Sequence, residues 1–372
     1  MKILQTPARF YPYTGGVENY TYNLSRELVK LGHEVSVICA NEPKSDIKEI
    51  DGIKLKKLDF IGKIANTNIT PTLPFSILNE DFDILHTHLP TPWSADWSAV
   101  VSFVKKKPLV LTYHNDIVGD GTASYIAKGY NLTALKFILK RASKIIITHS
   151  NYIEFSPYLK EYKENIEIVP VGVDVARFNP VETEVNGTIF FLSLLDEFHR
   201  YKGLDHLLDA LKLVKMEILR VKLKVGGGGK LLHYYREKAA SLGLEDNVEF
   251  LGYISEERIP EHYANCNLFV LPSISASQEG FGIVLLEALA SGIPVVSTDI
   301  VGMAEDIEKY NTGIVVKPGD TKALADAIVR IMQDKKEAER MGERGRKLVK
   351  ERYTWEKVCK DMEDIYNGVL DE

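Results

Sequence analysis

Residues 277–299, SQEGFGIVLLEALASGIPVVSTD, indicate the fold of this chain more clearly than any other stretch. They set two carboxylates, Glu279 and Glu287, around a glycine-bearing turn, and Gly292 and Pro294 interrupt the apolar run that follows. The pattern predicts a short helix, a turn and a buried strand. Glu287 would lie about two helical turns beyond Glu279. One carboxylate can then face a ligand at the helix N-terminus while the other reaches along the helix flank.

The start of this predicted helix offers backbone donors to a ligand. The N–H groups of Phe281, Gly282, Ile283 and Val284 have no acceptor within the helix, and the helix dipole adds positive potential, so a diphosphate or sugar hydroxyls could bind there. The alternative is a buried amphipathic helix with a stray glutamate. Glu287 argues against it, because an ionised carboxylate in an apolar run is costly unless something pairs with it.

The pattern EGFGIVLLEALASGIPVV, residues 279–296, resembles the paired-glutamate signature of the retaining family 4 glycosyltransferases. These enzymes have the GT-B fold, in which two Rossmann-like domains face each other. The resemblance extends over nearly the whole chain, in the order of the family. Its other pieces are GGVE (15–18), VPVGVD (169–174), YKG (201–203), the glycine run after Val225 and YTWEKV (353–358).

Short β-branched runs alternate with helical patterns along the chain, which predicts an α/β protein with two doubly wound parallel sheets. We expect an N-terminal domain at 1–174, a polar linker at 175–187 and a C-terminal domain at 188–354. The resemblance implies that a last helix, 355–372, returns to the N-terminal domain. Open parallel sheets bind ligands at the carboxyl ends of their strands, so a cleft between the domains would hold the ligand. The twelve expected strands lie near 2–5, 35–38, 84–86, 109–112, 145–148, 166–169, 189–193, 221–225, 248–251, 268–271, 295–297 and 313–316.

Composition agrees with a soluble globular protein. The 372 residues are 45% hydrophobic and 26% charged, with a net charge of -6. Residues 1–180 carry 21 Lys and Arg against 19 Asp and Glu, so the N-terminal half is the better face for an anionic acceptor or a membrane surface. The three cysteines form no CxxC pair, and the N-terminus lacks the pattern of a signal peptide, which together predict a cytoplasmic protein.

Two glycines, Gly15 and Gly16, precede a helix expected near 17–31. Consecutive glycines allow backbone N–H groups to approach a phosphate closely at a helix N-terminus. The alternative is a flexible turn that starts a helix. In the resembling family this loop lies against the donor diphosphate and the acceptor. Glu18 is expected to be an ordinary first-turn residue that the helix dipole favours.

A phosphate clamp is expected in LSLLDEFHRYKGLD, residues 192–205. Lys202 matches the donor-phosphate lysine of the family. Leu194 departs from the family, because many relatives have an arginine there. Arg200 could reach the same phosphates with its bidentate guanidinium, and the alternative is a solvated loop charge. Without a second cation, stabilisation of the transition state should be weaker by roughly 2–4 kcal/mol.

Histidines mark two further strand ends. His86 and His88, in LHTHLP, invite a metal interpretation, but no third ligand is evident and a structural or acceptor-facing role is favoured. His114, in LTYHND, matches the active-site histidine of the family, which lies near the transferred sugar. The alternative is a capping or satisfied loop histidine. Asp116 is a weaker candidate for the same neighbourhood.

The glycine run at 226–229 follows a predicted strand. It lacks the residues of a P-loop and the spacing of a dinucleotide fingerprint, which disfavours ATP hydrolysis and NAD binding. The resemblance places this loop near the nucleoside, with Gly252 and Tyr253 beside the base. A second amphipathic stretch, NLTALKFILKRASK (131–144), predicts either a core-packing helix or an interfacial helix that meets a lipid-linked acceptor. Core packing is favoured.

The resemblance implies a metal-independent, retaining glycosyltransferase without a cofactor. It would move a hexose from a nucleotide-diphosphate sugar (UDP- or GDP-sugar) to a hydroxyl of a glycan or a lipid-linked acceptor. Lys202 and Arg200 would neutralise the diphosphate, Glu279 would fix the sugar and Glu287 would bind the ribose. The alternatives are a non-catalytic nucleotide-sugar-binding protein and a sugar phosphorylase or epimerase of the same fold. No nucleic-acid partner is expected, peripheral contact with the inner face of a membrane is kept open, and the oligomeric state is open.

Overall fold

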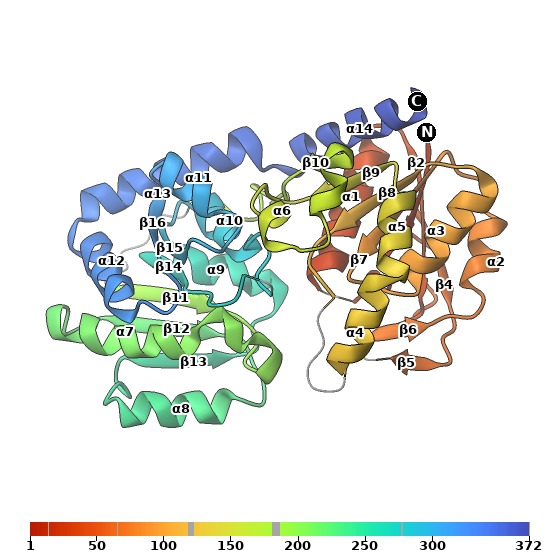
Figure 1. Ribbon diagram of the computed structural model, residues 1–372. Helices are drawn as coiled ribbons and strands as arrows, with labels where there is room; N and C mark the ends of the chain where they lie inside the picture. The colour runs from red at the N-terminus through yellow and green to blue at the C-terminus, as the bar shows by residue number, and fades with distance from the viewer. Residues whose placement is uncertain (14, 65, 118–122, 181–186, 277, 372) are drawn as a thin grey trace. The chain divides into compact units, whose positions relative to one another are not determined.

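The chain forms two units, each with its own parallel sheet, in the computed structural model (Figure 1). The first unit comprises Met1–Gly172 and the segment from Trp355 onward, and the second comprises Val173–Thr354. The structure describes residues 1–371 except 14, 65, 118–122, 181–186 and 277. The boundary follows Gly172, and part of the expected linker, 181–186, lies outside the described residues.

The sheet of the first unit has eight strands, in the order β10-β9-β8-β7-β1-β2-β4-β3. All neighbouring pairs are parallel except β3 and β4. A hairpin, β5–β6, forms a separate small sheet. The bounds are β1 Lys2–Thr6, β2 Glu34–Ala40, β3 Glu49–Ile50, β4 Ile53–Leu58, β5 Gly62–Ile64, β6 Thr67–Ile69, β7 Ile84–Leu89, β8 Leu109–Tyr113, β9 Lys144–Ile147 and β10 Ile166–Ile168.

The expectation of six strands in this half was wrong, because β3 to β6 were missed. The sequence of β4, IKLKKL, places lysines between buried apolar residues. That alternation belongs to a strand near a sheet edge with one wet face, whereas all six residues of the central strand β7 are buried. β3 has only two residues and the hairpin strands three each, so their patterns are too short to recognise.

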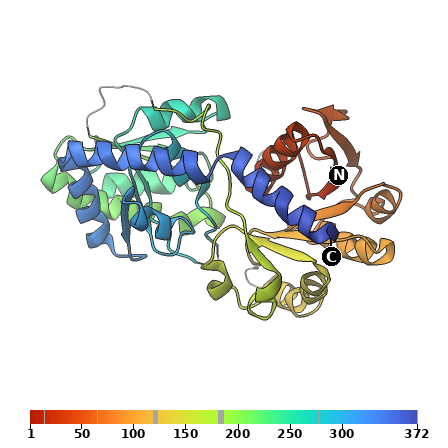
Figure 2. The ribbon, with the colours of Figure 1, turned by 90° about the horizontal axis from the view of Figure 1, so that it is seen from above.

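Helices cover the first sheet, and one of them comes from the far end of the chain. α14 packs against α1 (Figure 1, Figure 2), and the Trp355 ring lies 5.6 Å from that of Tyr20. A Cβ at Gly172 would come within 2.5 Å of the Trp355 ring, which explains the glycine. The helices of this unit are α1 Gly16–Lys30, α2 Leu73–Leu78, α3 Ser94–Lys105, α4 Ala123–Leu132, α5 Ala134–Arg141, α6 Tyr152–Phe155, a 3-10 helix Lys160–Asn165 and α14 Trp355–Asp371.

The second sheet has six parallel strands, in the order β13-β12-β11-β14-β15-β16. All six expected strands of this half are present, and the prediction of two doubly wound α/β sheets is confirmed. The strands are β11 Thr188–Leu192, β12 Lys222–Gly226, β13 Val248–Gly252, β14 Leu268–Leu271, β15 Val295–Thr298 and β16 Gly313–Val316. The helices are α7 Leu204–Glu217, α8 Leu232–Ser241, α9 Ile259–Ala264, α10 Ile283–Ala290, α11 Ala304–Lys309, α12 Thr321–Gln333, α13 Lys335–Arg352 and the 3-10 helices Glu197–Lys202 and Glu256–Arg258.

Each strand order has a point where its direction of growth reverses. In the first sheet β1 lies between β2 and β7, and in the second β11 lies between β12 and β14. Loops that leave two such neighbouring strands turn to opposite faces and open a crevice at the carboxyl edge. The loops after β11 and β14 carry Lys202 and Glu279, so the topology brings these residues together. No helix among the described residues is long and apolar enough to cross a membrane.

Candidate active site

A buried ion pair forms the centre of the site in the second unit. Glu279 is only 2% exposed, and its two carboxylate oxygens lie 2.8 and 2.9 Å from Nζ of Lys202. The hydroxyl of Ser273 donates to the same carboxylate, and the N–H of Gly280 lies 3.2 Å from it. Burial by itself would lower the pKa of Lys202, but the negative charge of Glu279, together with Tyr201 and the hydrogen bonds to both residues, raises the pKa. The ammonium group therefore stays charged at neutral pH.

Gly203 allows the lysine loop to reach the loop that carries Glu279. Its φ of +80° lies in the left-handed region, and a Cβ there would collide with the carbonyl oxygen of Pro272. Close by, the N–H of Ile274 donates to the carbonyl oxygen of Tyr201 at 2.8 Å. The two loops are thus joined through their backbones, which explains why glycine follows Lys202 in the YKG sequence.

The start of α10 presents unpaired backbone donors, as the sequence predicts. Gly282 is the N-cap residue, with a φ of +83°, and its Cβ would come 2.6 Å from Val301. Within the described part of the chain, no acceptor pairs with the backbone N–H groups of Phe281, Gly282, Ile283 or Val284. These donors and the helix dipole give the N-terminus of α10 the capacity to bind an anion.

Glu287 has one strong partner that the sequence did not reveal. Its Oε2 accepts a hydrogen bond of 2.9 Å from the hydroxyl of Tyr263, on α9. Burial raises the pKa of Glu287 to about 7, although the Tyr263 bond and the charge of Arg177 act in the opposite direction. The half-buried carboxyl group therefore changes charge near neutral pH. Its expected contact with a ribose stays a prediction.

Arg200 does not join Lys202 at Glu279. Its guanidinium lies 3.4 Å from Asp205 and 3.6 Å from Glu197, and it stacks 5.2 Å above the ring of Tyr234. Asp205 is held in turn by Lys238 at 3.1 Å. This geometry favours the alternative of a loop charge, and the phosphate-binding role of Arg200 stays a prediction. Leu194, where an arginine was expected, is exposed.

The glycine loop of the first unit is tied down by a buried arginine. Gly15 is the N-cap of α1, and its carbonyl oxygen accepts from the N–H of Asn19 at 2.8 Å. Glu18 lies in the first turn of α1, as expected, but it is buried and pairs with Arg9 at 3.4 Å. Burial also raises the pKa of Glu18. Arg9 donates to Asn66 at 3.0 Å and so links the glycine loop to the β5–β6 hairpin. A Cβ would have open space at Gly16.

Three histidines stack in a row in the first unit, with His86 and His88 buried and His114 half-buried. His114 Nε2 lies 3.3 Å from Nδ1 of His88, and Nε2 of His88 lies 2.9 Å from Gln5. His86 bonds Tyr366 at 2.6 Å and Thr112 at 2.7 Å, so its nitrogens are engaged within the core. This arrangement favours the structural role over metal binding for His86 and His88.

The same row is held in the neutral state. Desolvation lowers the pKa of His86 to about 3 and that of His114 to about 4, and it also lowers the pKa of His88 well below its usual value. His114, at the carboxyl end of β8, would therefore meet a ligand as a hydrogen-bonding group and not as a charge. Nearby Asp116 accepts from Tyr113 at 2.8 Å and from Ser156 at 2.7 Å. No three His, Cys, Asp or Glu residues of the described ranges are grouped as a metal site.

The glycine run at 226–229 packs tightly beside the expected base-binding residues. A Cβ at Gly227 would collide with the carbonyl oxygen of Ser193, and its N–H donates to the carbonyl oxygen of Gly252 at 2.8 Å. Tyr253, directly after β13, is 81% exposed, so its ring is free to stack on a base. Close packing explains part of this glycine run without any ligand.

Two Rossmann-like sheets and a carboxylate–lysine site at a helix N-terminus define a GT-B glycosyltransferase. The family model described as Glycosyltransferase Family 4 matches residues 14–177, and the model described as Glycosyl transferases group 1 matches residues 177–348. The chain therefore belongs to the family 4 glycosyltransferases and is a sugar-transferring enzyme.

Known relatives agree with this assignment. The O-antigen chain mannosyltransferase C of Escherichia coli is 28% identical, over 100% of this chain and 99% of its own length. The GDP-mannose-dependent alpha-(1-6)-phosphatidylinositol monomannoside mannosyltransferase of Mycobacterium tuberculosis is 30% identical over 55% of this chain and 56% of its own. The structure of Anabaena HepE in complex with UDP has the same fold, with a TM-score of 0.79 over 99% of this chain and 100% of that one, at 19% identity.

Proposed function

We propose that this enzyme is a retaining hexosyltransferase that needs no metal ion. It takes a hexose from a UDP- or GDP-sugar and transfers it to a hydroxyl of a glycan or a lipid-linked acceptor. The observation that carries the proposal is the buried Glu279–Lys202 pair beside the free N-terminus of α10. Cation, carboxylate and backbone donors are thus assembled in advance of any ligand, as electrostatic stabilisation of a leaving group requires.

Each group has a distinct task in this proposal. The three N–H donors of Lys202 allow it to hold Glu279 and a phosphate oxygen of the departing diphosphate at the same time. The N–H groups at the start of α10 add hydrogen bonds to the sugar or the phosphates. Glu279 accepts from sugar hydroxyls, and Glu287 accepts from ribose hydroxyls when it is ionised. Neutral His114 offers a hydrogen bond to the transferred sugar.

The named relatives support the donor and acceptor classes. One of them is GDP-mannose-dependent and is named for a phosphatidylinositol mannoside acceptor, and a second transfers mannose in O-antigen chains. A solved structure of the same fold binds UDP. Retention in this family is explained by attack on the face that the leaving phosphate occupies, with that phosphate acting as the base. No metal-bound step is required by this scheme.

The first test titrates the purified protein with UDP-, GDP- and ADP-sugars in the presence of EDTA. Melting temperature and slow donor hydrolysis are followed for the wild type and for Glu279→Gln and Lys202→Met. A matched control, Lys322→Met, breaks an exposed ion pair of the same unit. We expect one donor to raise the melting temperature and to be hydrolysed, with both effects lost in the two site variants and kept in the control.

Three results would overturn parts of the proposal. If no donor binds, the assignment of this site is wrong. If EDTA abolishes turnover and Mg²⁺ restores it, the metal-independent scheme is wrong. If NMR of the product shows that the anomeric configuration has inverted relative to the donor, the enzyme is not retaining.

A further inference from the structure

The helices α3 and α5 of the first unit pack against each other (Figure 1). Together they carry an exposed surface of mixed apolar and basic side chains. It stands apart from the core face of these helices, since Leu135, Ile138 and Leu139 are buried. The core-packing interpretation of residues 131–144 is therefore confirmed for this face. The remaining surface, here called the α3–α5 surface, comprises Val100, Phe103, Val104, Lys106, Lys107, Lys136, Phe137, Lys140 and Arg141.

Large apolar side chains are left in water on this surface. Phe103 is 67% exposed, Val104 is 62% exposed and Phe137 is 45% exposed. Single exposed apolar residues are common on proteins, but several on two helices that pack against each other indicate a contact surface. Within this unit no described element covers them.

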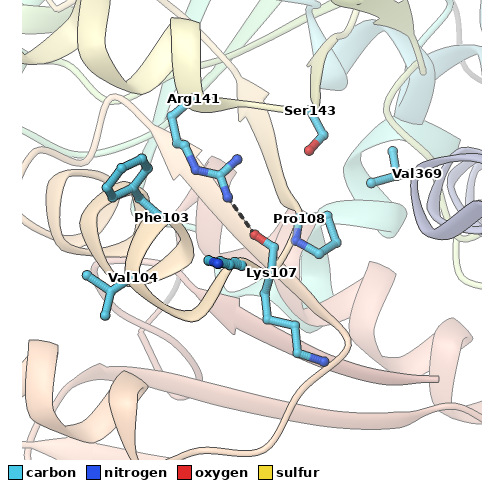
Figure 3. A pocket seen from close by; sticks show the side chains of 8 residues that line it. Phe103, Val104, Lys107, Pro108, Arg141, Ser143 and Val369 are labelled. Carbon is cyan, nitrogen blue, oxygen red and sulfur yellow. Dashed lines mark hydrogen bonds between the residues drawn. The ribbon is translucent and has the colours of Figure 1, made fainter. Parts of the chain in front are cut away.

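A shallow pocket opens beside Phe103 and Val104 (Figure 3). Its volume is about 580 Å³, and Phe103, Val104 and Arg141 line it together with Lys106 and Lys107. The Arg141 guanidinium donates to two backbone carbonyls, those of Lys107 at 2.8 Å and Ser102 at 3.1 Å. No carboxylate among the described residues pairs with Arg141 or Lys106, and Lys107 reaches Asp83 only at 4.0 Å. The pocket thus carries positive charge that the protein leaves largely unbalanced.

The charge of the surrounding segments is strongly biased. Residues 94–107 and 134–144 hold seven Lys and Arg against one acidic residue, Asp96, although the whole chain has a net charge of -6. The carboxylate of Asp96 accepts hydrogen bonds from the N–H of Trp93 at 2.9 Å and from the hydroxyl of Tyr130 at 2.7 Å. This local excess of positive charge selects a negatively charged partner.

We propose that the α3–α5 surface rests on a bilayer that contains anionic phospholipids, with Phe103, Val104 and Phe137 entering the interface. Apolar side chains among lysines are the pattern of a peripheral membrane contact, because lysine stems lie along the apolar region while their ammonium groups meet the headgroups. Arg141 and Lys106 would bind a lipid phosphate at the pocket. A second copy of the chain fits less well, since it would bring two basic surfaces together. The inference rests on the proposed function in one respect: the contact would bring the enzyme to its lipid-linked acceptor.

The test measures partitioning of the full-length protein onto vesicles by sedimentation. Vesicles of phosphatidylcholine alone are compared with vesicles that also contain phosphatidylglycerol. One variant carries Lys106→Gln, Lys136→Gln and Lys140→Gln, and its control carries Lys212→Gln, Lys336→Gln and Lys350→Gln, which remove the same charge from the other unit. A second variant carries Phe103→Ser and Val104→Ser. Its control carries Met216→Ser and Leu219→Ser, which are 77% and 78% exposed in the wild type.

We expect the wild type and both controls to bind only the anionic vesicles. The lysine variant should lose on the order of 100-fold in partitioning and the apolar variant on the order of 10-fold. The proposal is overturned if the wild type does not bind, or if the surface variants bind like their controls. It is also overturned if millimolar inorganic phosphate or glycerol phosphate abolishes binding, which would indicate a site for a free anion. A wild-type dimer that Phe103→Ser and Val104→Ser dissociate would assign the surface to a second copy instead.

Vesicle binding is measured without a sugar donor, and donor hydrolysis is measured on the same variants without vesicles. Failure of the membrane contact therefore leaves donor hydrolysis unchanged. Failure of the proposed function leaves vesicle binding unchanged, so the two failures are distinguishable.

Discussion

Replacement of Glu287 by glutamine should stabilise the folded protein above about pH 7 and leave its stability unchanged below about pH 4.5. Glutamine has nearly the same shape as glutamate, and its side-chain oxygen can still accept the hydrogen bond that Tyr263 donates at 2.9 Å. The substitution therefore removes the charge and keeps the contact. Any change in stability then reports the free energy of burying the charge.

The size of the effect follows from the pKa of Glu287. Burial raises it from 4.5 to about 7 in the folded protein. A rise of about 2.5 corresponds to about 3 kcal/mol at about 1.36 kcal/mol per pKa unit. Glu287 is only half-buried, so solvent screening reduces the expected gain to about 1–3 kcal/mol. For a unit of this size that gain raises the melting temperature by roughly 3–10 °C.

The sign follows from proton linkage. Between pH 4.5 and about 7 the folded protein keeps a proton on Glu287 that the unfolded chain has lost, so wild-type stability falls as pH rises through this window. Below this window Glu287 is neutral in both the folded and the unfolded protein, so the variant has no advantage in stability. Above it the gain is complete.

Calorimetry across this pH range measures the difference in stability between the wild type and Glu287→Gln. The control is Glu343→Gln, at an exposed position of α13. The reasoning is refuted if Glu287→Gln has the same advantage at about pH 4.5 as at about pH 8, or none at either. The same variant should bind its nucleotide-sugar donor more weakly at pH 8, because an amide accepts fewer hydroxyl hydrogens than a carboxylate does. A stabilised protein with weakened binding is the expected signature of a strained functional residue.

Three further predictions follow from the same contacts. Gly203→Ala should destabilise the fold by about 1–3 kcal/mol and weaken donor binding, because the φ of residue 203 is +80° and a Cβ there would strike Pro272. Gly243→Ala is the control: its φ is +68° but a Cβ has open space there, so only stability should change. Equal donor affinity in the two variants would contradict this prediction. Lys202→Met should lower the free energy of unfolding in urea by roughly 3–5 kcal/mol, because it leaves a buried carboxylate unpaired. Adding Glu279→Gln should recover most of that loss. Strictly additive losses would speak against a buried ion pair. In acid, hydrogen-exchange mass spectrometry should show the first unit opening before the second. Below about pH 6.5 the histidines of the unfolded chain bind protons that the buried histidines of the folded unit do not bind, which lowers the free energy of unfolding by up to about 2 kcal/mol per histidine near pH 5. The reverse order of opening would refute the prediction. The histidines concerned are His86, His88, His114 and His149.

Much of the architecture could be read from the sequence. Short runs rich in apolar and β-branched residues alternate with helical patterns, so all the strands of the second sheet and six of the first could be recognised. The lysine-bearing strand β4, next to the sheet edge, and the short strands β3, β5 and β6 could not, because their alternation is too brief or too polar. Glycines at 203 and 282 were recognisable as part of motifs, and the structure supplies the reason for them in positive φ values and close neighbours.

The pairings around the site were not predictable in the same way. Ser273 for Glu279, Tyr263 for Glu287 and Arg9 for Glu18 follow from no periodic pattern. Arg200 illustrates the limit most clearly. Its position two residues before Lys202 indicated a shared phosphate site, yet Asp205 and Tyr234 draw its guanidinium elsewhere.

Local patterns were sufficient to specify strands, helices and the glutamates near the start of α10, because these features depend on residues a few positions apart. Contacts between distant residues depended on which strand ends the fold makes neighbours. Lys202 and Glu279 are 77 residues apart in the chain and bond at 2.8 Å because β11 and β14 are adjacent in the sheet. The charge state of Glu287 likewise follows from the depth at which packing buries it, and that depth exists only once the sheet and its helices have closed around it.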